Sequence, residues 1–108
     1  MPDYVKLEIF VPESHFSQVR QALYAVDAGH IGKYDCCLSY SRVTSTWRPL
    51  AGAEPFIGET GALSQEEELK VEVTCSLAKL SETLAAVKRA HPYEEPVINV
   101  IPLLGIGI

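Results

Sequence analysis

The strongest constraint on the fold is one pattern that occurs twice: a short alternating segment followed by an amphipathic helical stripe. In residues 4–11 and 69–75, apolar and polar side chains alternate, which predicts two strands that each bury one face. After each strand, apolar side chains recur at the spacings i, i+3, i+7 and i+10, which predicts a helix with one buried stripe. The two stripes are Phe16, Val19, Leu23 and Val26, and Leu77, Leu80, Leu84 and Val87.

A further strand is predicted after each helix, at residues 33–43 and 97–104, with Gly29 as the left-handed C-cap of the first helix. Two βαβ halves are typical of the ferredoxin-like split βαβ sandwich, an α+β fold. We therefore expect residues 1–108 to form a single domain with an antiparallel four-stranded sheet and two helices on one face. Apolar residues such as Phe10 are expected on the uncovered face, which favours an oligomer.

Composition restricts the partners and the compartment. Nine basic and fourteen acidic residues give a net charge of -5, which argues against binding to nucleic acid or to an anionic membrane. The acidic run at residues 66–68 is expected to be a solvated strand entry. Three cysteines without CxxC spacing favour a reduced compartment, with Cys36 and Cys37 on a strand and at least one of them in the core. With no signal sequence or long apolar segment, a cytoplasmic location is expected.

The run from His91 to Pro96 places a ring nitrogen, a phenol and two carboxylates just before the last strand. One prediction is that the His91 ring caps the last carbonyls of the second helix. The other is that His91, with Glu94 or Glu95, holds a divalent metal ion, since nitrogen and oxygen ligands suit zinc, nickel or copper better than magnesium. Tyr93 is either a ligand contact or an interface aromatic.

The connection at residues 44–64 is long for a hairpin and is therefore a candidate functional loop. In this topology it emerges at the same end of the sheet as residues 91–95. The candidate ligand-binding residues are accordingly Trp47, Arg48, Tyr93, Glu94 and Glu95. His30 lies between glycines at the opposite end, so it is either a turn residue or a metal ligand that meets His91 only across an oligomer. For Arg48, stacking on Trp47, anion binding and pairing with an acid all remain open.

Four blocks of sequence carry a family resemblance. The run from His91 to Pro96, with the strand ending Ile101-Pro102-Leu103, resembles the final strand of CutA, the divalent-cation tolerance family, a trimeric ferredoxin-like domain related to PII signalling proteins. Together with residues 29–34, 47–49 and 52–58, it is similar to the CutA-like domain inserted in dinuclear-metal proteins related to NGG-interacting factor. The metal-binding halves of those longer proteins have no counterpart here, so we expect a standalone CutA/PII-like domain without their suggested hydrolase activity.

The resemblance implies a homotrimer whose intersubunit clefts hold a small ligand or a divalent metal ion. The leading hypothesis is a binding or regulatory module of this kind, and the alternative is a structural oligomerisation domain without a ligand. An enzyme is the least favoured reading, because the sequence contains no Ser-His-acid arrangement, P-loop, Rossmann fingerprint or HExxH motif. The sequence does not name the ligand or metal.

Overall fold

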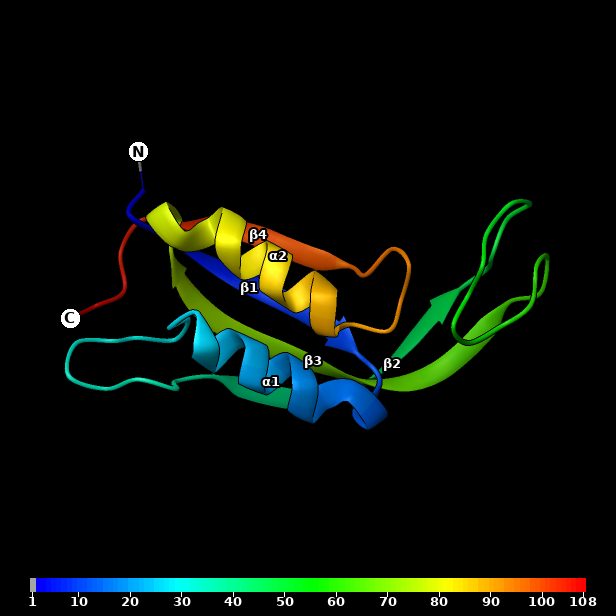
Figure 1. The fold of residues 1–108 in the computed structure, drawn as a ribbon, viewed down its shortest axis with the longest axis horizontal. Coiled ribbons are helices and arrows are strands. Elements are labelled where there is room, and N and C mark those ends of the chain that lie inside the picture. The colour runs from blue at the N-terminus through cyan, green and yellow to red at the C-terminus, as the bar shows by residue number, and fades with distance from the viewer. Residues whose placement is uncertain (1) are drawn as a thin grey trace.

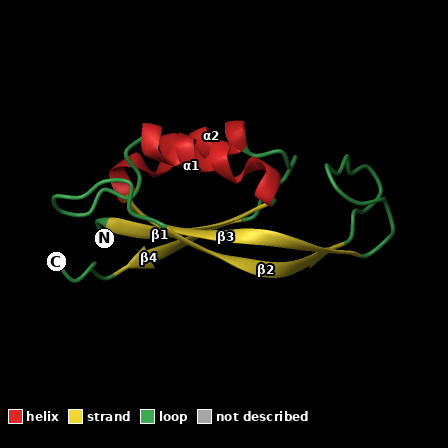
Figure 2. Cartoon of the chain, turned by 90° about the horizontal axis from the view of Figure 1, so that it is seen from below, coloured by secondary structure: helices red, strands yellow, loops and turns green. Residues whose placement is uncertain are grey.

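The computed structural model describes residues 2–108 and contains one sheet and two main helices (Figure 1). In chain order the elements are β1 (Tyr4–Val11), η1 (Glu13–His15), α1 (Phe16–Ala25), β2 (Ser39–Trp47), β3 (Ser64–Ser76), η2 (Leu77–Lys79), α2 (Leu80–Ala90) and β4 (Ile98–Leu103). The strand order is β2-β3-β1-β4, and every neighbouring pair is antiparallel. Figure 2 shows both helices on the same face of the sheet, which confirms the predicted split βαβ fold.

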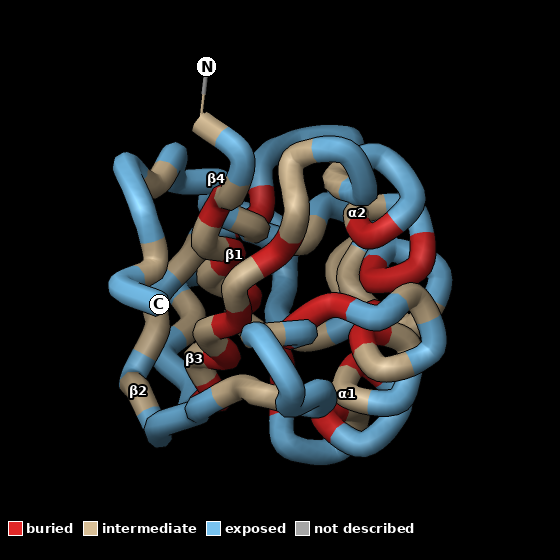
Figure 3. Tube along the Cα trace, turned by 90° about the vertical axis from the view of Figure 1, so that its left-hand side faces the viewer, coloured by how far each residue is buried: buried red, intermediate tan, exposed pale blue. Residues whose placement is uncertain are grey.

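The core lies between the two central strands and the helical stripes. Alternate residues of β1 and β3 are buried on the helix-facing side, and Figure 3 shows these buried segments facing α1 and α2. Burying each large aliphatic side chain contributes about 1.5–3 kcal/mol, so the alternating pattern is the main source of stability. The fully buried side chains include Leu7, Ile9, Val11, Val19, Leu23, Val71 and Val87.

The uncovered face of the sheet is more polar than the sequence suggested. Phe10 lies on this face as expected. The centre of the face, however, carries an ion-pair network in which the Lys6 ammonium contacts the Glu72 carboxylate and lies 3.5 Å from the Glu8 carboxylate. Lys70 lies 3.5 Å from the same Glu8 carboxylate. Alternation along a strand predicts which face a residue lies on. It does not predict which charged residues of neighbouring strands pair, because that depends on the register between the strands.

The second strand begins and ends later than predicted. It was expected at residues 33–43, whereas β2 starts at Ser39 and continues to Trp47. Residues 33–38 instead form a loop, in which Cys36 has a φ of 57°, outside the extended region. The expectation that these cysteines lie on a strand with one in the core was therefore wrong: Cys36 is exposed and Cys37 is half-buried, while the buried thiol is Cys75.

The C-cap of α1 is Val26, and the left-handed residue that follows it is Asp27 rather than the predicted Gly29. Asp27 has a φ of 60°, and its N–H donates to the Tyr24 carbonyl while the Ala28 N–H donates to that of Leu23, both at 3.0 Å. These two hydrogen bonds form a Schellman motif, and Asp is one of the few residues other than glycine that tolerate its left-handed position.

Gly29 instead allows its backbone to lie close to the backbones of Thr74 and Cys37. Its N–H donates to the Thr74 carbonyl at 2.8 Å, and its own carbonyl accepts from the Cys37 N–H at 3.0 Å. A Cβ at this position would lie 2.3 Å from the Cys37 carbonyl oxygen. Only glycine allows the chain after α1 to pack this tightly against the backbone of Cys37.

Among the helices of residues 2–108, none has the length and apolar character needed to cross a membrane.

Replacing Gly29 by alanine should lower the free energy of unfolding by about 3 kcal/mol, because a strained positive φ is combined with a backbone clash. Gly61→Ala is the matched control: Gly61 also has a positive φ, but a Cβ there meets nothing within 4 Å. That variant should lose only about 1 kcal/mol in urea denaturation. Equal losses in the two variants would contradict the close-approach explanation.

Candidate functional site

A cleft of about 770 Å³ opens where β2 and β3 extend beyond β1. Its lining residues come mainly from the end of β2, the loop at residues 48–63 and the turn at residues 91–97. Figure 1 shows this loop and this turn at the same end of the molecule. The candidate ligand-binding residues predicted from the sequence all line it: Trp47, Arg48, Tyr93, Glu94 and Glu95. The split βαβ topology thus brings together two segments that are separated by β3 and α2 in the chain.

The 48–63 loop is held to its surroundings by hydrogen bonds. Trp47, the last residue of β2, donates from Nε1 to the Ile57 carbonyl at 3.1 Å. The backbone N–H of Glu54 donates to Glu94 Oε1 at 2.8 Å, which ties the loop directly to the 91–97 turn. These two bonds fix the loop beside the 91–97 turn and so define the shape of the cleft.

Three aromatic rings form one wall of the cleft, with Tyr93 at their centre. The Tyr93 ring centroid lies 5.9 Å from that of Trp47 and 6.1 Å from that of Phe56, with interplanar angles of 50° and 46°. Phe56 is 50% exposed and packs edge-on against His15 on its other side. The rings are tilted and only partly covered, so they offer apolar surface to a bound molecule.

His91 connects the turn to the end of β1. Its Nε2 lies 2.7 Å from the Phe10 carbonyl oxygen, and its Nδ1 lies 3.2 Å from the Tyr93 backbone nitrogen. A carbonyl accepts and an amide donates, so these partners assign a neutral ring that carries its proton on Nε2. Burial lowers the pKa of His91, in agreement with that assignment. The ring therefore does not cap the last carbonyls of α2; the His91 backbone N–H does so, donating to Val87.

The geometry of the candidate metal ligands is unlike a preformed metal site. Both ring nitrogens of His91 already have backbone partners, and one carboxylate oxygen of Glu94 holds the loop. Across residues 2–108, no group of three or more His, Cys, Asp or Glu side chains is arranged to hold a metal ion. Coordination by His91, Glu94 and Glu95 would therefore require rearrangement or ligands from another subunit.

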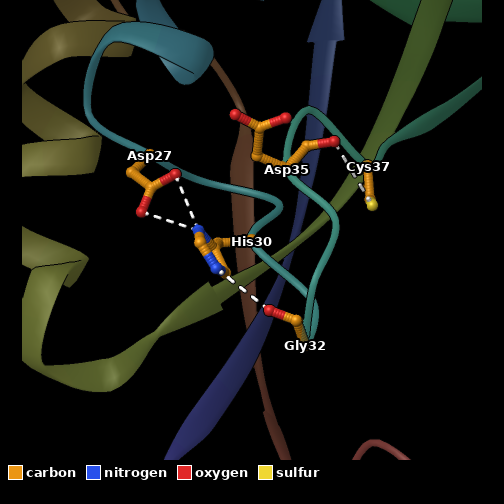
Figure 4. A network of polar contacts seen from close by, with 5 residues as sticks. All are labelled: Asp27, His30, Gly32, Asp35 and Cys37. Carbon is orange, nitrogen blue, oxygen red and sulfur yellow. Dashed lines mark hydrogen bonds and ion pairs between the residues drawn. The ribbon is translucent and has the colours of Figure 1, made fainter.

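His30 lies at the opposite end of the sheet, as expected, in a polar cluster shown in Figure 4. Its Nδ1 lies 3.1 Å and 3.0 Å from the two Asp27 carboxylate oxygens, and its Nε2 lies 3.2 Å from the Gly32 carbonyl. Both partners are acceptors, which favours a doubly protonated ring, and the hydrogen bond to Asp27 raises the pKa of His30. Within one subunit the structure does not bring His30 and His91 together.

Glu68 is the residue of this region that the sequence analysis missed. It was assigned to a solvated acidic run, yet it is only 4% exposed and lines the cleft. Its carboxylate accepts a hydrogen bond from the Tyr93 hydroxyl at 2.7 Å. Burial together with this bond raises the pKa of Tyr93. No local signal separates Glu68 from its two acidic neighbours, because its burial depends on a tyrosine 25 residues later.

Comparison with known proteins supports the resemblance seen in the sequence. No family model matches the chain. A GTP cyclohydrolase 1 type 2 homolog from Halalkalibacterium halodurans is 45% identical over 102 residues, which cover 94% of this chain and 27% of that protein. The Bacillus cereus protein related to NIF3 superimposes with a TM-score of 0.85 and 35% identity, covering 96% of this chain and 26% of that one.

CutA from Synechococcus elongatus shares the fold, with a TM-score of 0.70, 22% identity, and coverage of 95% of this chain and 79% of CutA. The chain therefore has a CutA/PII-like fold and corresponds in sequence to one segment of NIF3-related proteins. It spans about a quarter of the length of the curated relatives that it matches.

Tyr93→Phe should lower the free energy of unfolding by about 2 kcal/mol, because it removes the hydroxyl that satisfies the buried Glu68 carboxylate. Tyr40→Phe is the control, since Tyr40 is 53% exposed and packs through its ring on Phe16. The control should change the stability by less than about 0.5 kcal/mol in urea denaturation. Indistinguishable variants would show that the Tyr93 to Glu68 bond does not stabilise the turn.

The lowered pKa of His91 predicts that stability depends on pH. Where the pKa is lower in the folded protein than in the unfolded chain, the unfolded chain binds more protons, so stability rises with pH. The contribution is complete above the unfolded pKa of about 6.5 and is lost as the pH falls through the folded pKa. His91→Gln should lower stability by about 1 kcal/mol at neutral pH and flatten this dependence.

Denaturation midpoints measured from about pH 7.5 down to about pH 5 would check this dependence. His30 contributes with the opposite sign, because its pKa is raised: its stabilisation is present at low pH and lost as the pH rises. The comparison should therefore be made with His30→Gln present in both proteins. An unchanged slope after replacement of His91 would refute the assignment.

Proposed function

We propose that the 108 residues form a single regulatory domain that assembles as a homotrimer and binds a small ligand in the cleft between the 48–63 loop and the 91–97 turn. The observation that carries the proposal is the cleft itself. It combines an aromatic wall of Trp47, Phe56 and Tyr93 with a few charged side chains. Small-molecule sites have this composition, mostly apolar with a small number of placed polar groups.

A small organic ligand fits this geometry better than a bare metal ion. The apolar wall offers contact area that a metal ion does not use, whereas a metal ion needs several ligand atoms that converge on one point. His91 and Glu94 already use their polar atoms to hold the loop and the turn. In this proposal the candidate metal ligands His91 and Glu94 act as the support of the cleft.

The trimer is supported by the CutA-like fold and by the resemblance that implies threefold assembly. The structure adds one further reason: residues 64–68 of β3 pair with β2 but extend past β1, so their second edge has no strand beside it among residues 2–108. Exposed strand edges are normally covered. A neighbouring subunit at this edge would lie next to the cleft, so that ligand binding and subunit contacts would influence each other.

The same edge supports a second candidate, a structural oligomerisation domain without a ligand. In that case the hydrogen bond that Trp47 donates and the one that Glu94 accepts serve only to hold the loop for subunit contacts. The names of the relatives point to GTP, but this chain covers about a quarter of their length, so we do not extend an activity to it. GTP is therefore one of the compounds whose binding is tested.

Native mass spectrometry of protein purified without chelator should show a trimer that carries additional bound mass. Phe56→Ala should lose that mass but keep the subunit count, because Phe56 is half exposed and contributes mainly to the cleft wall. Leu63→Ala is the control, since Leu63 is exposed in the same loop but does not line the cleft. A trimer without bound mass that is unaffected by both changes would favour the structural alternative, and a monomer would contradict the assembly.

A further inference from the structure

The cleft contains a buried carboxylate that lacks a cationic partner. Glu68 is 4% exposed, and its one side-chain hydrogen bond within residues 2–108 comes from the neutral Tyr93 hydroxyl. None of the ion pairs in this part of the chain includes Glu68. Burying most of a carboxylate without a paired cation is unfavourable. The position is therefore suited to a positive charge that arrives with a bound molecule.

The aromatic wall beside Glu68 suits the same kind of molecule. Tyr93 touches both features, because its hydroxyl binds Glu68 while its ring contacts the rings of Trp47 and Phe56. The face of an aromatic ring carries partial negative charge and attracts cations within about 6 Å. Ammonium groups that carry methyl substituents are favoured at such walls, since their surface is apolar and their charge is spread.

The balance of charge in the cleft disfavours anions. Its charged lining residues are three glutamates and one arginine, namely Glu68, Glu94, Glu95 and Arg48. A highly anionic molecule such as a nucleoside triphosphate would be repelled by this excess of negative charge. An organic cation meets both the charge and the apolar surface.

We propose that the cleft binds an organic cation, with an alkylated ammonium group against the rings of Trp47, Phe56 and Tyr93 and its charge facing the Glu68 carboxylate. This inference rests on the proposed small-ligand function and specifies its ligand class. Glu68 acts as the charge partner, and Tyr93 positions it.

Trp47 allows a direct test, because it is the single tryptophan of the chain and lies in the cleft wall. Choline is the probe, and 3,3-dimethylbutanol is its uncharged counterpart of nearly the same shape. The fluorescence of Trp47 should change in a saturable way with choline. The neutral alcohol should bind about tenfold more weakly or worse, as expected when one ion pair and its cation–π contacts are absent.

Glu68→Gln isolates the contribution of the charge. The amide oxygen can still accept from Tyr93, so the turn should remain in place while affinity for choline falls about tenfold and affinity for the alcohol does not change. Glu67→Gln is the matched control, because Glu67 is the exposed neighbour on the same strand. Should Glu68→Gln not fold, Phe56→Ala tests the aromatic wall instead, with the same expected loss for choline.

The outcomes separate this inference from the general function. If GTP, inorganic phosphate or the neutral alcohol gives a saturable signal and choline does not, the cleft binds small molecules but the cation assignment is wrong. Equal affinity of choline for the wild type and Glu68→Gln would also overturn it. If no compound alters Trp47 fluorescence up to about 10 mM, both the cation assignment and the small-ligand function fail.

Discussion

The hydrogen bond from His91 Nε2 to the Phe10 carbonyl anchors the start of the 91–97 turn to the end of β1. A second bond, from the Phe10 N–H to the Val97 carbonyl, holds the other end of the turn to the same strand. The same ring accepts from the Tyr93 backbone N–H, which sets the path of the turn. Tyr93 then reaches Glu68 and the aromatic wall, and Glu94 reaches the loop. A single buried imidazole thus links the fold to the site.

The fold was predictable because its signals are local. Alternation in β1 and β3 and the two helical stripes follow directly from which residues are apolar, and the strand order then places the long loop beside the 91–97 turn. The start of β2 was not predictable from the same evidence, since the apolar run before Ser39 is interrupted by a left-handed Cys36. The burial of Glu68 and the ion pairs of Lys6 depend on partners far away in the sequence, so no local pattern encodes them.

His30 and His91, the two candidate metal ligands with imidazole rings, show how hydrogen-bond partners determine the protonation of a histidine. His91 is held between a carbonyl and an amide N–H, which fits a neutral ring, whereas His30 is held between a carboxylate and a carbonyl, which fits a charged one. In the sequence, His30 is followed by isoleucine and His91 by proline, and neither neighbour indicates the protonation of the ring. Their different chemistry arises from whether the chain presents acceptors alone or one acceptor and one donor.

The length of β3 has a consequence for the dynamics of the molecule. Residues 69–72 lie between β1 and β2, whereas residues 64–68 of the same strand have β2 on one side only. We therefore expect the amide protons of the doubly paired part to exchange only on global unfolding, and those of the singly paired part to exchange through local opening. The boundary falls between Glu68 and Leu69. Any contact that shields Glu68 would move this boundary along the strand, so that events in the cleft would alter the cooperativity of the sheet.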